Sequence, residues 1–438
     1  MKYRLLLIFL LLVCLSFTEA GVAAETAAKQ NMFSELQAMI TEAITQNIDL
    51  HISEKRWQIL KAKESQIRSF DDPMAMLKVQ NIPSSFPIVF DRDPMSAKVI
   101  GLSQTIPFPG KRSLNEKMAH QEAEAERWNM EQRKLEIGQM VKETVFGLWL
   151  VRREQQLIKQ MLVLATKKVA ISETRYATGE LSQPELFRIR VEQMKMIDMK
   201  MVYSQQQARH EHYLNLLLYR EPDTPVAPLA DFSLPELRFP DLELKAIALQ
   251  KLPRRHVLSS RIAASEAGLE LARKQWYPDF TFSIEYMLRS PVSTSMGTDP
   301  GNDMLSLGMS FALPVQLGKH RSMETEAMLR KMASHDEIVA LDRTLEYDIN
   351  ETIRTLRRLK QQCDLHASGI IPENRQLVRS SAAKLRVSSA GFSEFLDTQL
   401  EQLSAERELL RLQAEYMITL SRLEVLSGIP LMENDSEQ

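Results

Sequence analysis

Two stretches in the second half of the chain alternate apolar and polar residues with a period of two. Between 280 and 288 the even-numbered residues are large and apolar. Between 304 and 313 the odd-numbered residues are large and apolar. Because successive side chains of a strand point to opposite faces, each stretch predicts a strand with one apolar and one polar face. Each has about 10 residues, the length of a tilted strand that crosses a bilayer. A hairpin of a soluble sandwich, with one face in its core, fits the same pattern.

The first half of the chain predicts two more strands, between helices. A helix is expected over 32–69, and strands over 75–79 and about 97–106. No proline occurs between Gly110 and Pro184, and apolar residues recur there at intervals of three and four, so a helix over about 113–176 is expected. Its length would be roughly 95 Å.

A turn at 176–182 then reverses the chain, because Gly179 can end a helix and Ser182 can cap the next one, which runs to about 219.

The pattern starts again after five prolines between 222 and 240. Pro73 recurs as Pro278 after 205 residues, Gly110-Lys111 as Gly318-Lys319 after 208, and Gly179 as Gly391 after 212. Such regular spacing predicts a tandem duplication. The second copy should contain a helix over 241–276, the two strands above, a long helix over 319–387 bent at Gly369 and Pro372, and a return helix over 393–428. The expected segments are a signal peptide (1–24), a first repeat (25–220), a Pro-rich linker (221–240), a second repeat (241–430) and a polar tail (431–438).

The first residues predict export from the cytoplasm. Lys2 and Arg4 precede an apolar run over 5–17, and small residues at 20–24 offer a cleavage site. The mature chain would keep one cysteine, Cys363, and no internal disulfide. No later segment is apolar enough to span a membrane as a helix, so a membrane location would require the strands.

Four strands in lipid would leave two unpaired sheet edges, and each unpaired backbone group there costs several kcal/mol. Closure therefore requires several copies: two copies give eight strands, filled by their own side chains, and three give twelve, with room for a lumen. The polar-face residues Thr281, Ser283, Glu285, Ser306 and Ser310 suit a watery interior.

Several motifs occur in an order that resembles the TolC-type outer-membrane efflux factors. They are Gly110-Lys111-Arg112 after Pro-Phe-Pro, Tyr-x-x-Gly-x-x-Ser at 176–182, Tyr277-Pro278-Asp279 and the ending at 423–428. The residues at 106–112 are most similar to those of the heavy-metal (cobalt-zinc-cadmium) branch. The resemblance implies a mainly α fold with a membrane β-barrel portion. Each chain would give four strands and long antiparallel helical hairpins, assembled as a homotrimer with a 12-stranded β-barrel and a 12-helix α-barrel.

The same resemblance implies a location in the outer membrane, in contact with its lipid, with an extension into the periplasm. It also implies two protein partners: a periplasmic adaptor (membrane fusion) protein and a proton-driven inner-membrane pump. The adaptor would dock at the hairpin ends, and an acidic ring near the narrow end of the tunnel would contribute to closure and to cation preference. The docking residues carried over by position are Arg175, Tyr176, Gly179, Leu181, Ser182, Gly391, Phe392 and Ser393. The pore-constriction residues are Asp397, Glu394 and its first-repeat equivalent Glu185.

Charge and composition exclude little beyond a nucleic-acid partner. The 55 basic and 57 acidic residues are interspersed, which argues against nucleic-acid binding. No catalytic motif, cofactor motif or metal motif is evident, so we expect no enzyme and no bound cofactor. Met194, Met196, Met199 and Met201 fit helix packing better than copper binding, and His210 and His212 face different directions on a helix. Two alternatives remain open: a soluble periplasmic coiled-coil scaffold, and a metal-binding protein.

Overall fold

The computed structural model divides the chain into two compact units, each built from both halves of the sequence. The strand-bearing unit comprises Ile52–Asn129 and Arg254–Leu341, and the helical unit comprises the remainder. The predicted signal peptide lies outside the described residues. The described residues are 33–82, 93–237, 239–294, 297–387 and 392–432.

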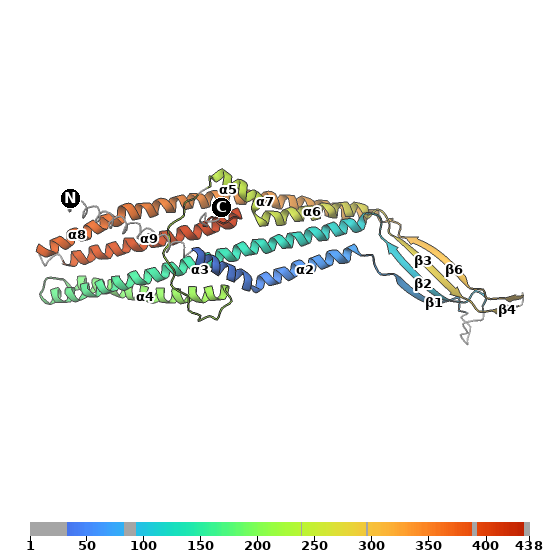
Figure 1. Cartoon of the computed structure of the whole chain (residues 1–438), viewed down its shortest axis with the longest axis horizontal. Helices are drawn as coiled ribbons and strands as arrows, with labels where there is room; N and C mark the ends of the chain where they lie inside the picture. The colour runs from blue at the N-terminus through green and yellow to red at the C-terminus, as the bar shows by residue number, and fades with distance from the viewer. Residues whose placement is uncertain (1–32, 83–92, 238, 295–296, 388–391, 433–438) are drawn as a thin grey trace, which may run out of the picture. The chain divides into compact units, whose positions relative to one another are not determined.

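The strand-bearing unit contains an antiparallel four-stranded sheet in the order β1-β2-β3-β6 (Figure 1). The first repeat supplies β1 (Met74–Gln80) and β2 (Ala97–Ile106), and the second supplies β3 (Phe280–Leu288) and β6 (Met304–Phe311). The repeats join where β2 pairs with β3. Each half therefore contributes one edge of the sheet.

The register of the sheet places the apolar positions of all four strands on one face. Leu77 lies opposite Ile100, Ile100 opposite Tyr286, and Tyr286 opposite Leu305. The other face carries mainly small and polar side chains, although Met76, Val99, Met287 and Met304 also lie on it. The hydroxyls of Thr105 and Thr281 on this face lie 2.9 Å apart across two strands. The predicted alternation is confirmed.

The apolar face of the sheet is exposed in the single chain. Leu77 is 82% exposed and Leu307 is 78% exposed. A contiguous face of large apolar side chains marks a surface that another phase or another molecule covers. Its other exposed members are Val79, Ile100, Leu102, Ile106, Phe282, Ile284, Tyr286, Leu288, Leu305, Met309 and Phe311.

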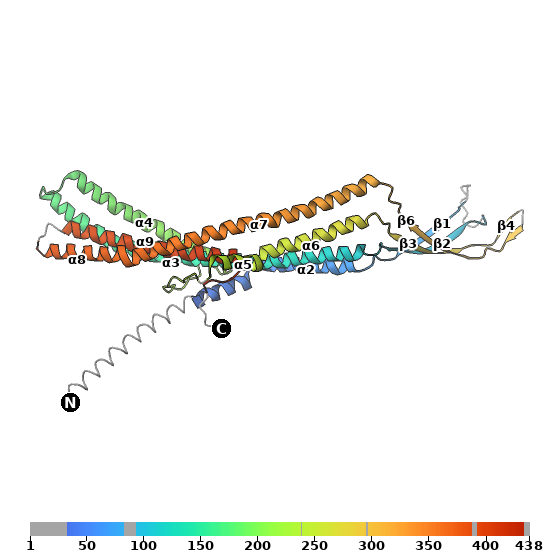
Figure 2. The same cartoon turned by 90° about the horizontal axis from the view of Figure 1, so that it is seen from above.

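The loop between β3 and β6 contains a short hairpin that we did not expect from the sequence. It consists of β4 (Val292–Thr294) and β5 (Gly297–Asp299), beyond the end of β3 (Figure 2). Arg289 fixes it: its guanidinium lies 2.6 Å from the Asp299 carboxylate and donates to the carbonyl oxygen of Pro94 at 2.5 Å. Short Ser- and Thr-rich strands lack the apolar alternation that would reveal them.

Two helices that the sequence predicted as continuous are each divided. The predicted helix 32–69 is a helix over 33–46 followed by α2 (Ile48–Arg68). The break is at Asn47, whose side-chain oxygen accepts a hydrogen bond from the backbone N–H of Leu50 at 3.1 Å, as an N-cap does. The predicted helix 241–276 is α5 (Asp241–Lys251) and α6 (Pro253–Lys274). Pro253 has no N–H to continue α5, but it suits the first position of α6.

The long helices match the predicted bounds closely. They are α3 (Lys111–Ala177), α4 (Gln183–Leu217), α7 (Leu317–Leu365), α8 (Ile371–Val387) and α9 (Phe392–Ser427). The 67 residues of α3 give a rod about 100 Å long. The predicted bend before Pro372 is a π-helical turn, His366–Ile370, between α7 and α8.

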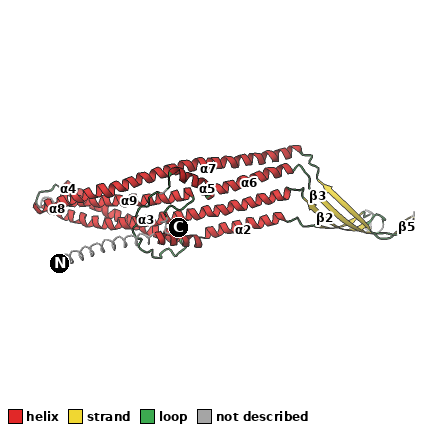
Figure 3. Ribbon diagram, turned by 45° about the horizontal axis from the view of Figure 1, so that its top comes forward, coloured by secondary structure: helices red, strands yellow, loops and turns green. Residues whose placement is uncertain are grey.

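In the strand-bearing unit, the helices follow the order of the strands to which they connect. Figure 3 shows α2, α3, α6 and α7 side by side in that order. Glu64 on α2 lies 3.1 Å from His120 on α3. Trp128 on α3 stacks on His256 on α6, and Arg273 on α6 lies 3.2 Å from Glu324 on α7. The outermost helices, α2 and α7, therefore flank this layer as β1 and β6 flank the sheet.

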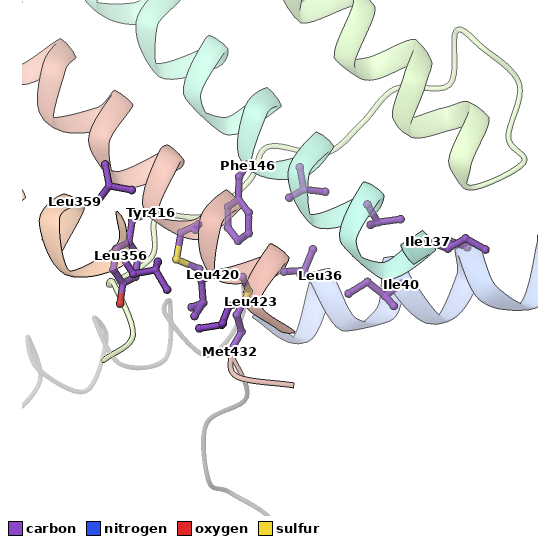
Figure 4. Close-up of a cluster of buried hydrophobic side chains, with 14 of the residues drawn as sticks. Leu36, Ile40, Ile137, Phe146, Leu356, Leu359, Tyr416, Leu420, Leu423 and Met432 are labelled. Carbon is purple, nitrogen blue, oxygen red and sulfur yellow. The ribbon is translucent and has the colours of Figure 1, made fainter. Parts of the chain in front are cut away.

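The main core lies in the helical unit and mixes both repeats (Figure 4). Ile40 and Phe146 from the first repeat pack in one cluster with Leu356 and Leu420 from the second. The Pro-rich segment 221–240 packs against the same cluster. Its hydrogen bonds hold it there: Tyr416 donates to the carbonyl oxygen of Pro235 at 2.6 Å, and Arg152 to those of Val226 (2.8 Å) and Ala227 (2.7 Å).

A buried ion pair joins the two repeats near the end of α9. Lys142 Nζ lies 2.5 Å from the carboxylate of Glu424, which is 5% exposed. The same carboxylate accepts the backbone N–H groups of Leu431 (2.7 Å) and Met432 (3.0 Å). Glu424 therefore fixes the last described turn to α3 and α9.

Lys142→Met should destabilise the fold by about 3 kcal/mol, because it leaves a buried carboxylate without its cation. The measurement is the free energy of unfolding in detergent, followed by circular dichroism. The matched control is Arg330→Met, which removes an exposed pair with Glu326 and should change stability by less than about 1 kcal/mol. Equal effects of the two substitutions would contradict a structural role for the buried pair.

Candidate functional site

The turn that joins α3 to α4 is held by its own hydrogen bonds. Gly179 has φ +78°, a conformation that residues with a Cβ rarely adopt. Its N–H donates to the carbonyl oxygen of Tyr176 at 3.0 Å, and the N–H of Glu180 donates to that of Arg175 at 2.8 Å. These bonds satisfy carbonyl groups that the end of α3 leaves free.

The first residue of the return helix is capped as the sequence predicted. The Glu185 carboxylate accepts the backbone N–H of Ser182 at 3.0 Å and its hydroxyl at 2.6 Å. These hydrogen bonds hold the pKa of Glu185 below its usual value. The first-repeat carboxylate that the resemblance assigned to a pore constriction therefore already serves as a helix cap.

Side chains around this turn are accessible to a partner. Tyr176 is 44% exposed, and Ser182 is exposed as well. Arg175 and Leu181 are partly covered, and the Arg175 guanidinium lies 3.6 Å from the Glu180 carboxylate. All five predicted docking residues of the first repeat thus lie together at one helix-hairpin end.

The second hairpin end is described only in part. Gly391 lies outside the described residues. Phe392 begins α9, where its ring centroid lies 6.2 Å from that of Phe395, and Ser393 follows in the first turn. Glu394 lies 2.7 Å from Lys384 on α8.

Asp397 pairs with a cation from the other hairpin. Its carboxylate forms an ion pair with the ammonium of Lys168 on α3, which also lies 3.6 Å from Glu192 on α4. Lys168 is only 9% exposed. The pair therefore links α9 to the first hairpin, and the charge of Asp397 is balanced within its own chain.

Sequence patterns did not indicate that Lys168 would pair with Asp397. A lysine in a long amphipathic helix is ordinarily solvated, and only the packing of α3 against α9 reveals its partner. A second polar contact, between α3 and α4, was also missed: Tyr203 on α4 donates to Glu154 on α3 at 3.3 Å. Burial raises the pKa of Glu154 above its usual value.

The methionine stripe of α4 is divided between core and surface. Met196 and Met199 pack against a cluster that includes Ile158 and Met161 of α3. Met194 is 62% exposed and so does not share that cluster. The described residues contain no group of three or more His, Cys, Asp or Glu side chains that could hold a metal ion.

No helix within the described part of the chain combines the length and the apolar character needed to cross a membrane.

No protein-family model matches this sequence, and no curated protein matches it either. Among solved structures, the chain is similar to the outer membrane protein VceC from Vibrio cholerae, with TM-score 0.72 and 16% identity over 92% of this chain and 98% of that chain. It is also similar to the Campylobacter jejuni CmeC outer membrane channel, with TM-score 0.72 and 15% identity over 91% and 87% of the two chains.

A third similar structure is the open state of the Neisseria gonorrhoeae MtrE outer membrane channel, with TM-score 0.71 and 17% identity over 90% and 89% of the two chains. CusC, whose structures concern transmembrane channel formation, has TM-score 0.72 and 15% identity over 91% and 92% of the chains. This chain therefore has the fold of these outer-membrane channels. The resemblance to the TolC type that its motifs indicated is confirmed at the level of fold.

The capped turn at Ser182 should weaken in acid. Because the folded pKa of Glu185 is lowered, its stabilisation is complete above the usual value of 4.5 and is lost as the pH falls through the folded pKa. The amide protection factors of Leu186, whose N–H donates to the carbonyl oxygen of Ser182, and of Phe187 should fall as the pH is lowered from about 7 to about 3. Glu185→Gln keeps a neutral acceptor, so its protection should not vary with pH. A parallel decline in both proteins would show that Glu185 is not the titrating group.

Proposed function

We propose that this chain is the outer-membrane channel-tunnel of a tripartite efflux system, a passive exit duct that performs no chemistry. The observation that carries this proposal is the exposed apolar face of the β1-β2-β3-β6 sheet, opposite a polar face. In a bilayer the apolar face would contact lipid and the polar face would line water. The fold, which the chain shares with outer-membrane channels, supports the same assignment.

Three copies would complete the duct. One sheet has two free edges, which lipid cannot satisfy, whereas twelve strands from three chains close into a barrel with a lumen. The long helices, α3 and its second-repeat equivalent α7–α8, would extend the duct through the periplasm. The chain would reach the outer membrane after its signal peptide is removed.

The hairpin ends would receive a periplasmic adaptor that links the duct to a proton-driven inner-membrane pump. Support for this docking site comes from the exposed Tyr176 and from a turn ordered by its own hydrogen bonds, which binding does not have to order. The proposed contact residues are the eight named from the sequence: Arg175, Tyr176, Gly179, Leu181, Ser182, Gly391, Phe392 and Ser393.

Near the same ends, Asp397 and Glu394 would form the pore constriction, with Glu185 in a capping role. Their partners Lys168 and Lys384 modify the expected effect, since each pair is close to neutral. Only separation of a pair would give the pore a ring of free carboxylates, which repel one another and attract cations. We therefore assign the ring to an open state.

Heavy-metal cations are one class of cargo that fits this duct, but the pump and adaptor would select the cargo. Two alternatives are disfavoured. In a soluble coiled-coil scaffold, the apolar sheet face would be exposed to water without a function. A metal-binding role would need a cluster of ligands, which the described residues do not contain. Stoichiometric metal uptake by the purified protein would instead support a metal-binding function.

The purified protein should form long-lived conducting pores in planar lipid bilayers without pump or adaptor. The readout is single-channel conductance, because only a closed barrel with a watery lumen conducts stably. A folded preparation, verified by its helical circular dichroism, that inserts into lipid but gives no conductance in any buffer would contradict a duct.

Opposite substitutions of one ion pair should shift the selectivity of those pores in opposite directions. Lys168→Met leaves Asp397 unbalanced and should raise the cation-to-anion permeability ratio by about twofold or more. Asp397→Asn removes the acid of the same pair and should lower that ratio. The measurement is the reversal potential in a salt gradient, and Lys384→Met serves as the comparison at the Glu394 pair. A Lys168→Met pore with unaltered selectivity would exclude Asp397 from the constriction.

A further inference from the structure

A groove runs along α6 in the strand-bearing unit, between its neighbours α3 and α7 (Figure 3). Its volume is about 520 Å³, and small-molecule sites usually have volumes of roughly 300–1,000 Å³. α6 forms the floor with small residues at intervals of four, Ala264, Gly268 and Ala272. The groove extends from Gln275, near the sheet, to Arg261, which lies roughly 21 Å farther along the helix.

The half of the groove nearer the sheet is apolar. Met118 of α3 and Met323 of α7 lie on its two sides, and Leu271 of α6 lies on its floor. Met118 reaches over Gly268, where its Cε lies 3.5 Å from the position that a Cβ would occupy. Methionine side chains are flexible and adapt to irregular apolar surfaces. This half therefore suits a flexible apolar chain.

The half farther from the sheet carries charges, and the register of the helices places three of them at one level. Glu266 on α6 lies 3.0 Å from Lys331 on α7, and the ion pair between these helices nearer the sheet shows that they are antiparallel. Five residues farther from the sheet, Arg261 is level with position 336 and so with the adjacent Glu337. The stacking of α3 on α6 places Glu122 within one residue of the same level.

The other charges of this half are balanced by ion pairs. Arg330 lies 2.9 Å from Glu326, and both residues line the groove. Glu122 lies 3.7 Å from Lys63 on α2. These pairs leave one basic and one acidic residue in the lining.

Arg261 and Glu337 are these two residues. Both are exposed, and neither forms an ion pair within the part of the chain that the structure describes. Because they lie at one level on neighbouring helices, a ligand balances both only if it carries an anion and a cation close together. A zwitterionic headgroup has this pattern: its phosphate can accept hydrogen bonds from the Arg261 guanidinium, and its ammonium can donate to the Glu337 carboxylate.

We propose that this groove binds a zwitterionic lipid with a single acyl chain, such as a lysophosphatidylethanolamine. The chain lies along Met118, Gly268 and Met323, and the headgroup lies between Arg261 and Glu337. The source of the lipid rests on the proposed membrane location of the sheet. In that location the chain points toward the bilayer and the headgroup toward the periplasm, which is the orientation of a lipid in the periplasmic leaflet.

Native mass spectrometry of the purified full chain in a non-ionic detergent tests the site. The probe is myristoyl lysophosphatidylethanolamine. The comparison lipids are monomyristoylglycerol, which has the same chain without charge, and myristoyl lysophosphatidylglycerol, which lacks the ammonium. The zwitterionic probe should bind once per chain, and about fivefold or more tightly than either comparison lipid. Glycerophosphoethanolamine, the headgroup without a chain, should not compete.

Two variants test the two halves of the groove separately. Gly268→Leu fills the apolar half and should abolish binding of the probe. Glu337→Gln removes the partner of the ammonium, so the zwitterionic probe should bind no more tightly than lysophosphatidylglycerol. The matched controls are Ala333→Leu and Asp336→Asn, at exposed positions of α7 outside the lining, and both should keep the binding of the unmodified protein. Helical circular dichroism verifies that each variant is folded.

The outcomes separate this site from the proposed function. Equal binding of all three lipids overturns the zwitterionic site, and full binding by Gly268→Leu overturns its position. Absence of probe binding by a protein that still conducts in planar bilayers overturns the site and leaves the duct intact. Selective binding by a protein that never conducts supports the site and contradicts the duct.

Discussion

Backbone hydrogen bonding in a medium without water is the constraint on which the rest of this structure depends. Among the described residues, the four-stranded sheet is open and apolar on one face, and β1 and β6 each have one edge without a partner strand. Exposure of the apolar face to water costs free energy, and so does exposure of the unpaired backbone groups at the sheet edges to lipid. The proposed closure with other copies in lipid would satisfy the face and the edges together.

The tandem repeat builds this sheet from two similar halves, and each half contributes two neighbouring strands and one long helical hairpin. The halves do not fold as separate bodies. They interleave in the sheet at β2 and β3, in the cluster around Phe146 and Leu420, and in the Lys142–Glu424 pair. The Pro-rich segment between the halves takes part in the core, where its carbonyl groups accept hydrogen bonds from Arg152 and Tyr416. Polar contacts near the hairpin ends then connect helices that lie far apart in sequence.

The sequence predicted those parts of the fold whose signal is local and repeated. The alternation at 280–288 predicted a two-faced strand, and the absence of proline after Gly110 predicted the rod of α3. Local capping chemistry likewise predicted the turn at Gly179 and Ser182. The helix breaks at Asn47 and Pro253 were missed because the apolar periodicity continues across both positions. The two residue types were nevertheless a signal, since Asn often caps a helix and Pro often begins one.

Contacts between distant segments could not be predicted from local patterns. Lys168 and Asp397 are 229 positions apart, and nothing in either helix indicates the other. The same holds for the hairpin of β4 and β5, which depends on Arg289 and Pro94. For the candidate site, the sequence located the hairpin ends but not the partners that balance its acids. Because Asp397 and Glu394 are paired with Lys168 and Lys384, the proposed acidic ring requires these pairs to separate.

The most direct test of the central claim is the environment of adjacent residues on β6. Spin labels at Leu307→Cys and Ser306→Cys, in protein reconstituted into bilayers, can be compared by their accessibility to oxygen, which concentrates in lipid, and to a water-soluble nickel complex. The account predicts that the label at 307 is relaxed mainly by oxygen and the label at 306 mainly by nickel. Equal accessibility of both labels to the nickel complex would contradict it, because the apolar face would then not lie in lipid.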